Sequence, residues 1–253
     1  MSQKVKPAFA NFAVDHMTVC FHPKLYTVMY AVMQILFGLT PDDLLYEKRR
    51  KHKDGKEVSM TFANRVGRWE AKEGNELETI FAVVQPSEPE NEPSHVRTML
   101  DGYGRAAHLQ HVALRTSDLI SFHKFALERG IQFVTPILRD DHDNLIQIFS
   151  GEIFHPGAKS SGFFFEFLQR EPSEGELAEL QKANKQTWFR DETFLGLYEE
   201  KEREYQSGKV RPLLSDELFM AISEKIGSRQ VWELDGKALD EIEQIMLKHG
   251  KKA

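Results

Sequence analysis

Cysteine is almost absent from this 253-residue chain, which contains only Cys20. A single thiol cannot form a disulfide within the chain and cannot build a metal site of several thiolates. The N-terminus also lacks the apolar core of a signal peptide, and no run approaches the roughly 18 apolar residues that span a membrane. We therefore expect a protein of a reducing compartment, the cytoplasm, with no membrane partner.

A basic stripe is missing as well. Asp and Glu number 39 against 33 Lys and Arg, which gives a net charge of -6, with the acidic residues spread along the chain. Nucleic acid is not an expected partner, because its binding needs a basic face. The strongly charged run at 47–57 (EKRRKHKDGKE) is typical of a solvated hairpin or loop. The 41% of hydrophobic residues is typical of a globular, enzyme-sized protein.

Hydrophobic periodicity predicts the same order of elements twice, a strand, a helix and further strands. The first copy consists of a strand at 12–21, a helix at 26–39 and strands at 58–64 and 77–84. The second consists of a strand at 109–115, a helix at 117–129 with Ser117 as its N-cap and Gly130 as its stop, and strands at 131–134, 145–149 and 162–169. Each copy carries a histidine on its first strand, His16 or His111.

The last third of the chain predicts helices. Residues 173–206 are rich in Glu, Lys and Leu with aromatic residues among them, and two further helices are expected at 215–226 and 236–249. We therefore expect paired modules over residues 1–170, at about 11–100 and 108–170, followed by a helical segment over 171–253.

Glu166 is the clearest anomaly in the sequence, because it lies within the aromatic strand GFFFEFLQR. Strand alternation puts its side chain on one face with Phe164 and Leu168, so Glu166 points either to solvent or into a site. His16 and His111 pose the same question, since a lone histidine on an apolar strand is commonly a core residue. Together, two imidazoles and one carboxylate form the ligand set of non-haem Fe(II) oxygenases.

Four segments resemble the hallmark segments of the catalytic, C-terminal domain of 4-hydroxyphenylpyruvate dioxygenase, a family of the vicinal oxygen chelate superfamily. They are DHMTV around His16, LQHVALRTSDLI around His111, LIQIF at 145–149 and FFFEFLQR around Glu166, in the family's order. The likeness covers about residues 11–206. It implies an α+β fold of paired βαβββ modules that form a half-open barrel, with a C-terminal helical extension, and Fe(II) held by His16, His111 and Glu166.

The same resemblance implies a substrate site and a reaction. Phe189 and Phe194 match two stacking phenylalanines of the family's lid helix, here at about 187–206, while Gln147 and Ser59 match residues beside the substrate. The implied reaction is oxidative decarboxylation of a 2-oxo acid by O2, coupled to hydroxylation of the same substrate. The metal ligands are the only catalytic residues that it implies. A homodimer is compatible with this expectation.

The chain departs from the family pattern around the substrate. The lid glycines are replaced by Trp188, Arg190 and Glu192, and the family's Pro-Leu-Asn-Glu motif reads QPSEP here, which offers Ser87. Two alternatives therefore stay open: an extradiol, catechol-cleaving dioxygenase, and a non-catalytic binding protein on the same fold. A glyoxalase-like Zn or Ni enzyme ranks last, because it needs a fourth protein ligand and neither Gln110 nor Glu76 is a convincing one.

Overall fold

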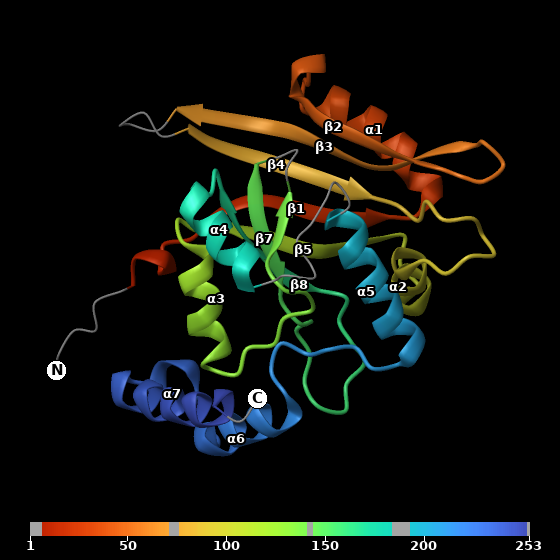
Figure 1. Ribbon diagram of the computed structural model, residues 1–253. Helices are drawn as coiled ribbons and strands as arrows, with labels where there is room; N and C mark the ends of the chain where they lie inside the picture. Colours follow the sequence, from red (N-terminus) through yellow and green to blue (C-terminus); the bar gives the residue numbers. More distant parts are fainter. Residues whose placement is uncertain (1–6, 71–75, 141–143, 184–192, 252–253) are drawn as a thin grey trace. The chain divides into compact units, whose positions relative to one another are not determined.

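The computed structural model describes residues 7–70, 76–140, 144–183 and 193–251 (Figure 1). The chain divides into two compact units. One, here called the N-terminal unit, comprises Ala13–Leu114 and Lys201–Gly208. The other, the C-terminal unit, comprises Met1–Phe12, Arg115–Glu200 and Lys209–Ala253.

The N-terminal unit is built around strands in the order β2-β3-β4-β1-β5. Its elements are β1 (Ala13–Phe21), α1 (Pro23–Leu36), η2 (Pro41–Asp43), β2 (Leu44–Lys51), β3 (Glu57–Glu70), β4 (Glu76–Val84), α2 (His95–Tyr103) and β5 (Ala107–Arg115). β1 runs parallel to β4, whereas β3 is antiparallel to both β2 and β4. β1 is thus an inner strand, which fixes the direction of the histidine that it carries.

Helix α1 covers one face of these strands. Pro23 opens the helix at a position where its missing N–H costs nothing, and the His22 side chain accepts a hydrogen bond from the Lys24 amide. Tyr26 and Met33 are buried from α1 against Phe62 and Val83. Tyr26 and Met33 lie seven residues apart on one side of the helix, and Phe62 and Val83 are direct partners across β3 and β4, so all four share one interface.

The C-terminal unit contains the strand order β8-β7-β6, all antiparallel. Its elements are η1 (Ala8–Ala10), α3 (Leu119–Leu127), β6 (Leu138–Asp140), β7 (Leu145–Phe149), β8 (Phe164–Arg170), α4 (Glu174–Ala183), the first part of α5 (Thr193–Ser207), α6 (Asp216–Ile226), η3 (Val231–Glu233) and α7 (Gly236–Gly250). Phe149, Phe164 and Leu197 of α5 pack together in one buried apolar cluster with Val134 and Leu138.

The element order β1-α1-β2-β3-β4 followed by β5-α3-β6-β7-β8 is a βαβββ module repeated once. The predicted α+β class, with paired modules and C-terminal helices, is therefore confirmed. β7 and the start of α6, capped by Ser215, lie where they are expected. Among the described residues, no helix combines the length and apolar composition needed to cross a bilayer.

Some details differ from the expected elements. The expected strand at 131–134 is wrong, because Ile131 and Phe133 form only single bridges, to Leu214 and Ser150. The α3 N-cap is Asp118 and not Ser117, since Asp118 Oδ1 accepts from the Ser121 amide. The charged run at 47–57 does form a hairpin, one of its two expected forms, in which the end of β2 turns into β3. Helix α2 follows the proline-rich connection, where no helix was expected.

The α6–α7 pair lies side by side (Figure 1) and is joined to the second module by backbone pairing. The Glu152 amide donates to Arg211 O at 2.9 Å, and the Leu213 amide donates to Glu152 O at 2.7 Å. Gly151 allows this approach, because a Cβ there would lie 2.2 Å from Pro212 O. A side chain at this position therefore has to push two backbones apart.

We predict that Gly151→Ala lowers the free energy of unfolding by about 1–3 kcal/mol, the usual range for forced overpacking. Gly236→Ala is the matched control, since nothing lies within 4 Å of a Cβ at that helical position. Urea denaturation of both variants measures the difference. Equal stability of the two would contradict the close approach at Pro212.

Candidate metal centre

His16 lies on β1, and the residue before it holds its ring. The Nδ1–H of His16 donates to Asp15 Oδ1 at 3.1 Å, because a carboxylate can only accept. The Asp15 side chain is 3% exposed and that of His16 is 19% exposed. With Nδ1 engaged, Nε2 is the nitrogen that His16 presents for coordination, as in carboxylate–histidine–metal triads.

His111 lies on β5 and repeats this arrangement with an amide in place of the carboxylate. Its Nδ1 lies 3.1 Å from Gln110 Oε1, and both residues are buried. An amide oxygen accepts, so Nδ1 carries the proton and Nε2 again becomes the coordinating nitrogen. The first strand of each module thus carries a histidine whose preceding residue fixes its tautomer.

Glu166 lies on β8 and is 3% exposed, so its carboxylate does not point to bulk solvent. Antiparallel pairing places Glu166 opposite Phe149, and Gln147 opposite Leu168. Paired side chains, and those two residues apart on a strand, share a face of the sheet. Glu166, Phe149 and Gln147 therefore lie on the same face of the β7–β8 pair.

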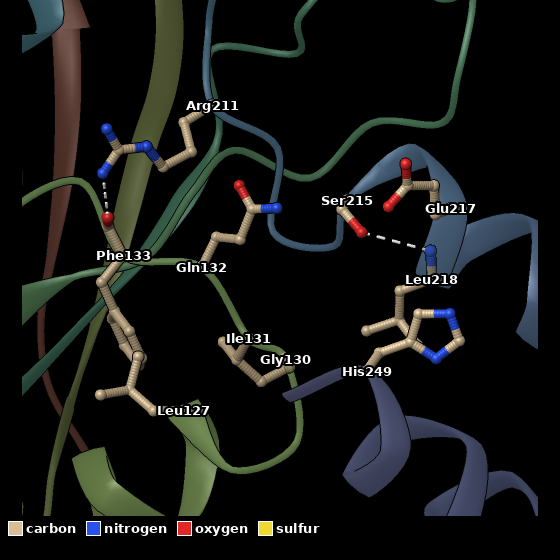
Figure 2. Close-up of a pocket in the computed structure, with 10 residues that line it drawn as sticks. All are labelled: Leu127, Gly130, Ile131, Gln132, Phe133, Arg211, Ser215, Glu217, Leu218 and His249. Atoms are coloured by element: carbon tan, nitrogen blue, oxygen red, sulfur yellow. Dashed lines mark hydrogen bonds between the residues drawn. The ribbon is translucent and has the colours of Figure 1, made fainter. Parts of the chain in front are cut away.

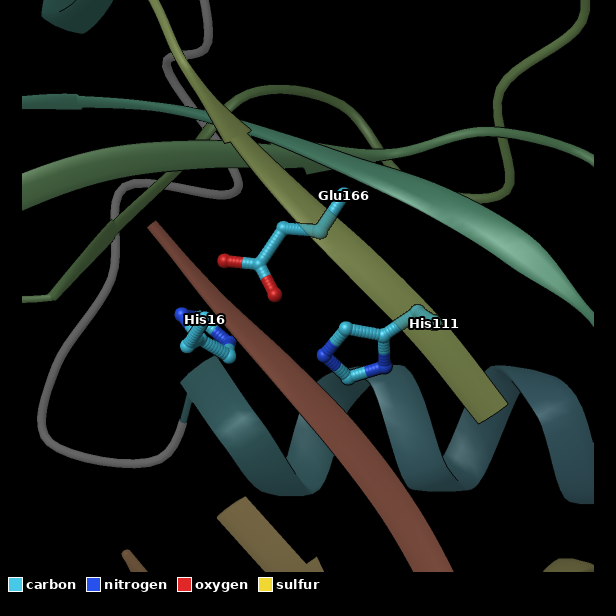
Figure 3. Close-up of side chains that lie close together, drawn as sticks. All are labelled: His16, His111 and Glu166. Atoms are coloured by element: carbon cyan, nitrogen blue, oxygen red, sulfur yellow. The ribbon is translucent and has the colours of Figure 1, made fainter. Parts of the chain in front are cut away.

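His16, His111 and Glu166 converge (Figure 3), and each offers a ligand atom within 4.8 Å of those of the other two. The two imidazole rings are edge-on, with centroids 5.6 Å apart and an interplanar angle of 77°. The three residues that the sequence singled out are thus brought together. Among the described residues, no other group of three His, Cys, Asp or Glu side chains meets in this way.

The donor set fits a borderline metal ion with open coordination positions. Two neutral imidazoles and one carboxylate give two nitrogens and one oxygen, the ligand type of Fe(II) in non-haem oxygenases. A metal ion also supplies the positive charge that a buried carboxylate requires. Three protein ligands would leave coordination positions of the metal open, whereas a structural zinc site would take four protein ligands.

The predicted substrate residues of the N-terminal unit take part in internal hydrogen bonds. Ser59 Oγ lies 2.9 Å from the Tyr26 hydroxyl. Ser87 is buried, and its Oγ accepts from Arg50 Nε at 3.0 Å while Arg50 Nη2 donates to Glu88. These contacts hold both serines in place, and their contact with a substrate stays a prediction.

The predicted lid residues are described only in part. Phe189 lies outside the described residues, and Phe194 lies on α5 with its side chain outside the described part. The helix itself supplies Leu197, which is buried against Phe149 and Phe164. Because Phe149 shares a face with Glu166, α5 covers the glutamate side of the β7–β8 pair.

A pocket of about 910 Å³ also lies within the C-terminal unit (Figure 2). It is lined from the end of α3 to Phe133, by Arg211, by the start of α6 and by His249. Two of its polar groups make hydrogen bonds within the fold: Ser215 Oγ accepts from the Leu218 amide at 3.2 Å, and Arg211 donates to Phe133 O at 2.5 Å. None of the predicted site residues lines it.

Sequence reasoning missed Asp15 and Gln110 as supports of the metal ligands. Their positions in the sequence could have indicated this role. Each carries a hydrogen-bond acceptor and directly precedes a candidate histidine on the first strand of its module. Adjacent strand residues normally point to opposite faces, which hides such a contact in a simple alternation analysis.

Neither a protein-family model nor a curated protein matches the chain. Among solved structures, a triple mutant of 4-hydroxymandelate synthase from Streptomyces coelicolor is similar, with a TM-score of 0.51 and 16% identity. The match covers 78% of this chain, which spans only 55% of the synthase chain.

Methylmalonyl-CoA epimerase from Mycobacterium tuberculosis is also similar, with a TM-score of 0.43 and 17% identity. That match covers 70% of this chain and 97% of the epimerase, and at this TM-score it carries no argument. With the repeated βαβββ order and the likeness to the synthase, the chain has a fold of the vicinal oxygen chelate type.

Proposed function

We propose that the protein is an Fe(II)-dependent dioxygenase that acts on a 2-oxo acid and couples its oxidative decarboxylation to hydroxylation of the same molecule. The observation that carries this proposal is the convergence of His16, His111 and Glu166 within 4.8 Å. When bound, Fe(II) would supply a chelating centre for the carboxylate and keto oxygens of the substrate and a position for O2.

The three ligands themselves bind the metal and transfer no proton. Asp15 and Gln110 hold the two imidazoles with Nδ1 protonated, so that both rings offer a lone pair on Nε2. Glu166 contributes the negative charge that partly neutralises a divalent ion. All three ligands stand on strands, which hold each side chain more exactly than a loop does.

The surroundings of Glu166 support a site from which water is excluded. Phe149 and Phe164 form an edge-to-face pair with ring centroids 6.2 Å apart, and Leu197 of α5 packs on them. Gln147 brings one amide to the same face, where it can donate to or accept from a substrate oxygen. An apolar wall with a single amide suits a substrate that has an apolar body and a polar group.

The substrate assignment rests on the sequence resemblance. Phe189 and Phe194 are proposed to stack on a planar part of the substrate, and Ser59 and Ser87 to orient its polar end. The similar synthase is named for 4-hydroxymandelate, a hydroxylated aryl acid, which agrees with an aryl 2-oxo acid as the first compound to test. At 16% identity, that likeness supports the fold alone.

We predict that Glu166→Gln, which keeps the shape of the side chain but removes its charge, weakens Fe(II) binding by more than about 100-fold. Loss of a residue that only supports a ligand costs at most about that much affinity. His16→Ala should have an effect of the same size, because it removes one of three ligands. Anaerobic titration with Fe(II), followed by metal analysis after gel filtration, measures both variants.

His155→Ala is the matched control for these two variants. His155 is exposed, and its ring contacts Pro156 O and Phe219 outside the ligand group. It should bind Fe(II) as the wild type does. Full iron content in His16→Ala would reject the proposed centre.

We predict that the Fe(II)-loaded protein consumes O2 and releases one CO2 per O2 with at least one aryl- or alkyl-pyruvate. A visible charge-transfer band should appear anaerobically only when the 2-oxo acid is added, since chelation requires both of its oxygens. Oxygen electrode traces and labelled CO2 measure the stoichiometry. O2 uptake with catechols and with none of the 2-oxo acids would reject this reaction in favour of extradiol cleavage.

A further inference from the structure

The amide of Gln110 connects two buried histidines in the N-terminal unit. Its Oε1 lies 3.1 Å from His111 Nδ1, and its Nε2 lies 3.3 Å from His95 Nε2. His95 is the first residue of α2, whereas Gln110 and His111 are neighbours on β5. All three side chains are nearly inaccessible to solvent, so the contacts are not exchanged for water.

The direction of this amide decides which nitrogen of His111 can bind a metal. With Oε1 toward His111, the ring must carry its proton on Nδ1, and Nε2 keeps the lone pair that coordination needs. A rotated amide would donate from its NH2 group to Nδ1. The His111 proton would then reside on Nε2, where it blocks coordination.

His95 fixes that direction by acting as an acceptor. Its Nε2 can accept from the Gln110 NH2 group only when the ring is neutral and protonated on Nδ1. A His95 ring with a proton on Nε2, either in its other neutral tautomer or as a cation, would instead donate from Nε2 and attract the amide oxygen. The state of His95 and the tautomer of His111 are therefore coupled through one amide.

The surroundings of His95 keep it neutral. Burial lowers the pKa of His95 to about 3, and the positive charges of Lys201 and Arg50 act in the same direction. Lys201 is itself buried and forms an ion pair with Glu204 at 2.9 Å. The ring also stands at the N-terminus of α2, where the helix dipole disfavours a cation.

We propose that His95 is a positioning residue which, through the amide of Gln110, sets the tautomer of His111 and thereby its ability to bind the metal. The part of this inference that concerns metal binding rests on the proposed metal centre. The tautomer itself is a property of the metal-free protein. His16 has no part in the relay, because Asp15 holds its ring.

Two variants of His95 test whether the ring matters because it accepts a hydrogen bond or only because it fills space. His95→Phe keeps a ring but removes the acceptor, whereas His95→Gln offers an amide oxygen to the Gln110 NH2 group. Gln110→Met removes the amide that links His95 to His111. It serves as the test variant if His95→Phe does not fold. Circular dichroism and thermal unfolding establish which variants are folded.

The first readout is nitrogen NMR of the imidazole rings in the metal-free protein, with His111 assigned from the spectrum of His111→Gln. The wild type and His95→Gln should show Nδ1–H on His111. In His95→Phe and Gln110→Met a substantial fraction should carry Nε2–H, while His16 stays unchanged as the internal control.

The second readout is the dissociation constant of Co(II), which is stable in air and visible in its spectrum. His95→Phe and Gln110→Met should raise the constant about 10- to 100-fold, the range for partners of ligating histidines, and His95→Gln should stay within about threefold of the wild type. An unchanged His111 tautomer and Co(II) constant in the folded relay variants would overturn the proposal. A wild type that binds neither Co(II) nor Fe(II) would reject the metal centre, and the tautomer would still test the relay.

Discussion

The burial of the Glu166 carboxylate is the constraint on which the rest of the site depends. A carboxylate that is 3% exposed is tolerated only where positive charge or hydrogen-bond donors offset its lost hydration. The two imidazoles that converge on it carry their Nδ1 protons toward Asp15 and Gln110 and therefore direct lone pairs, not protons, at the centre. In the proposed metal centre, a divalent cation would accept these lone pairs and offset the charge of the carboxylate.

Within each unit, the neighbouring elements fix the side chains of the ligands which that unit carries. β1 is enclosed by neighbouring strands, the β7–β8 pairing sets the face of Glu166, and α5 closes that face through Leu197. Each histidine is steadied by its own predecessor in sequence. The two supports differ, however, because Asp15 is an acceptor in every state, whereas the Gln110 amide has to be oriented by something else.

Much of the fold was predictable because hydrophobic alternation and helix caps are local. The strand with His16, strand β7 and the start of α6 at Ser215 follow directly from such patterns. The ligand set became predictable only as a set, since each member alone has an ordinary structural explanation. Contacts between distant segments were not predictable: the bridges that replace a strand at 131–134, and the meeting of His95 with Gln110, depend on tertiary packing. The roles of Gln147, Ser59, Ser87, Phe189 and Phe194 depend on a substrate and stay predictions.

The position of β2 in the strand order gives a physical reason for the charged run at 47–57. β2 is the terminal strand, paired with β3 along one side. An open strand edge presents backbone groups to which another molecule can add a strand, and lysine or arginine side chains along such an edge oppose this addition. The charges of Lys48, Arg49 and Lys51 therefore oppose the addition of a strand at this edge, whereas Arg50 is engaged by Ser87 and Glu88.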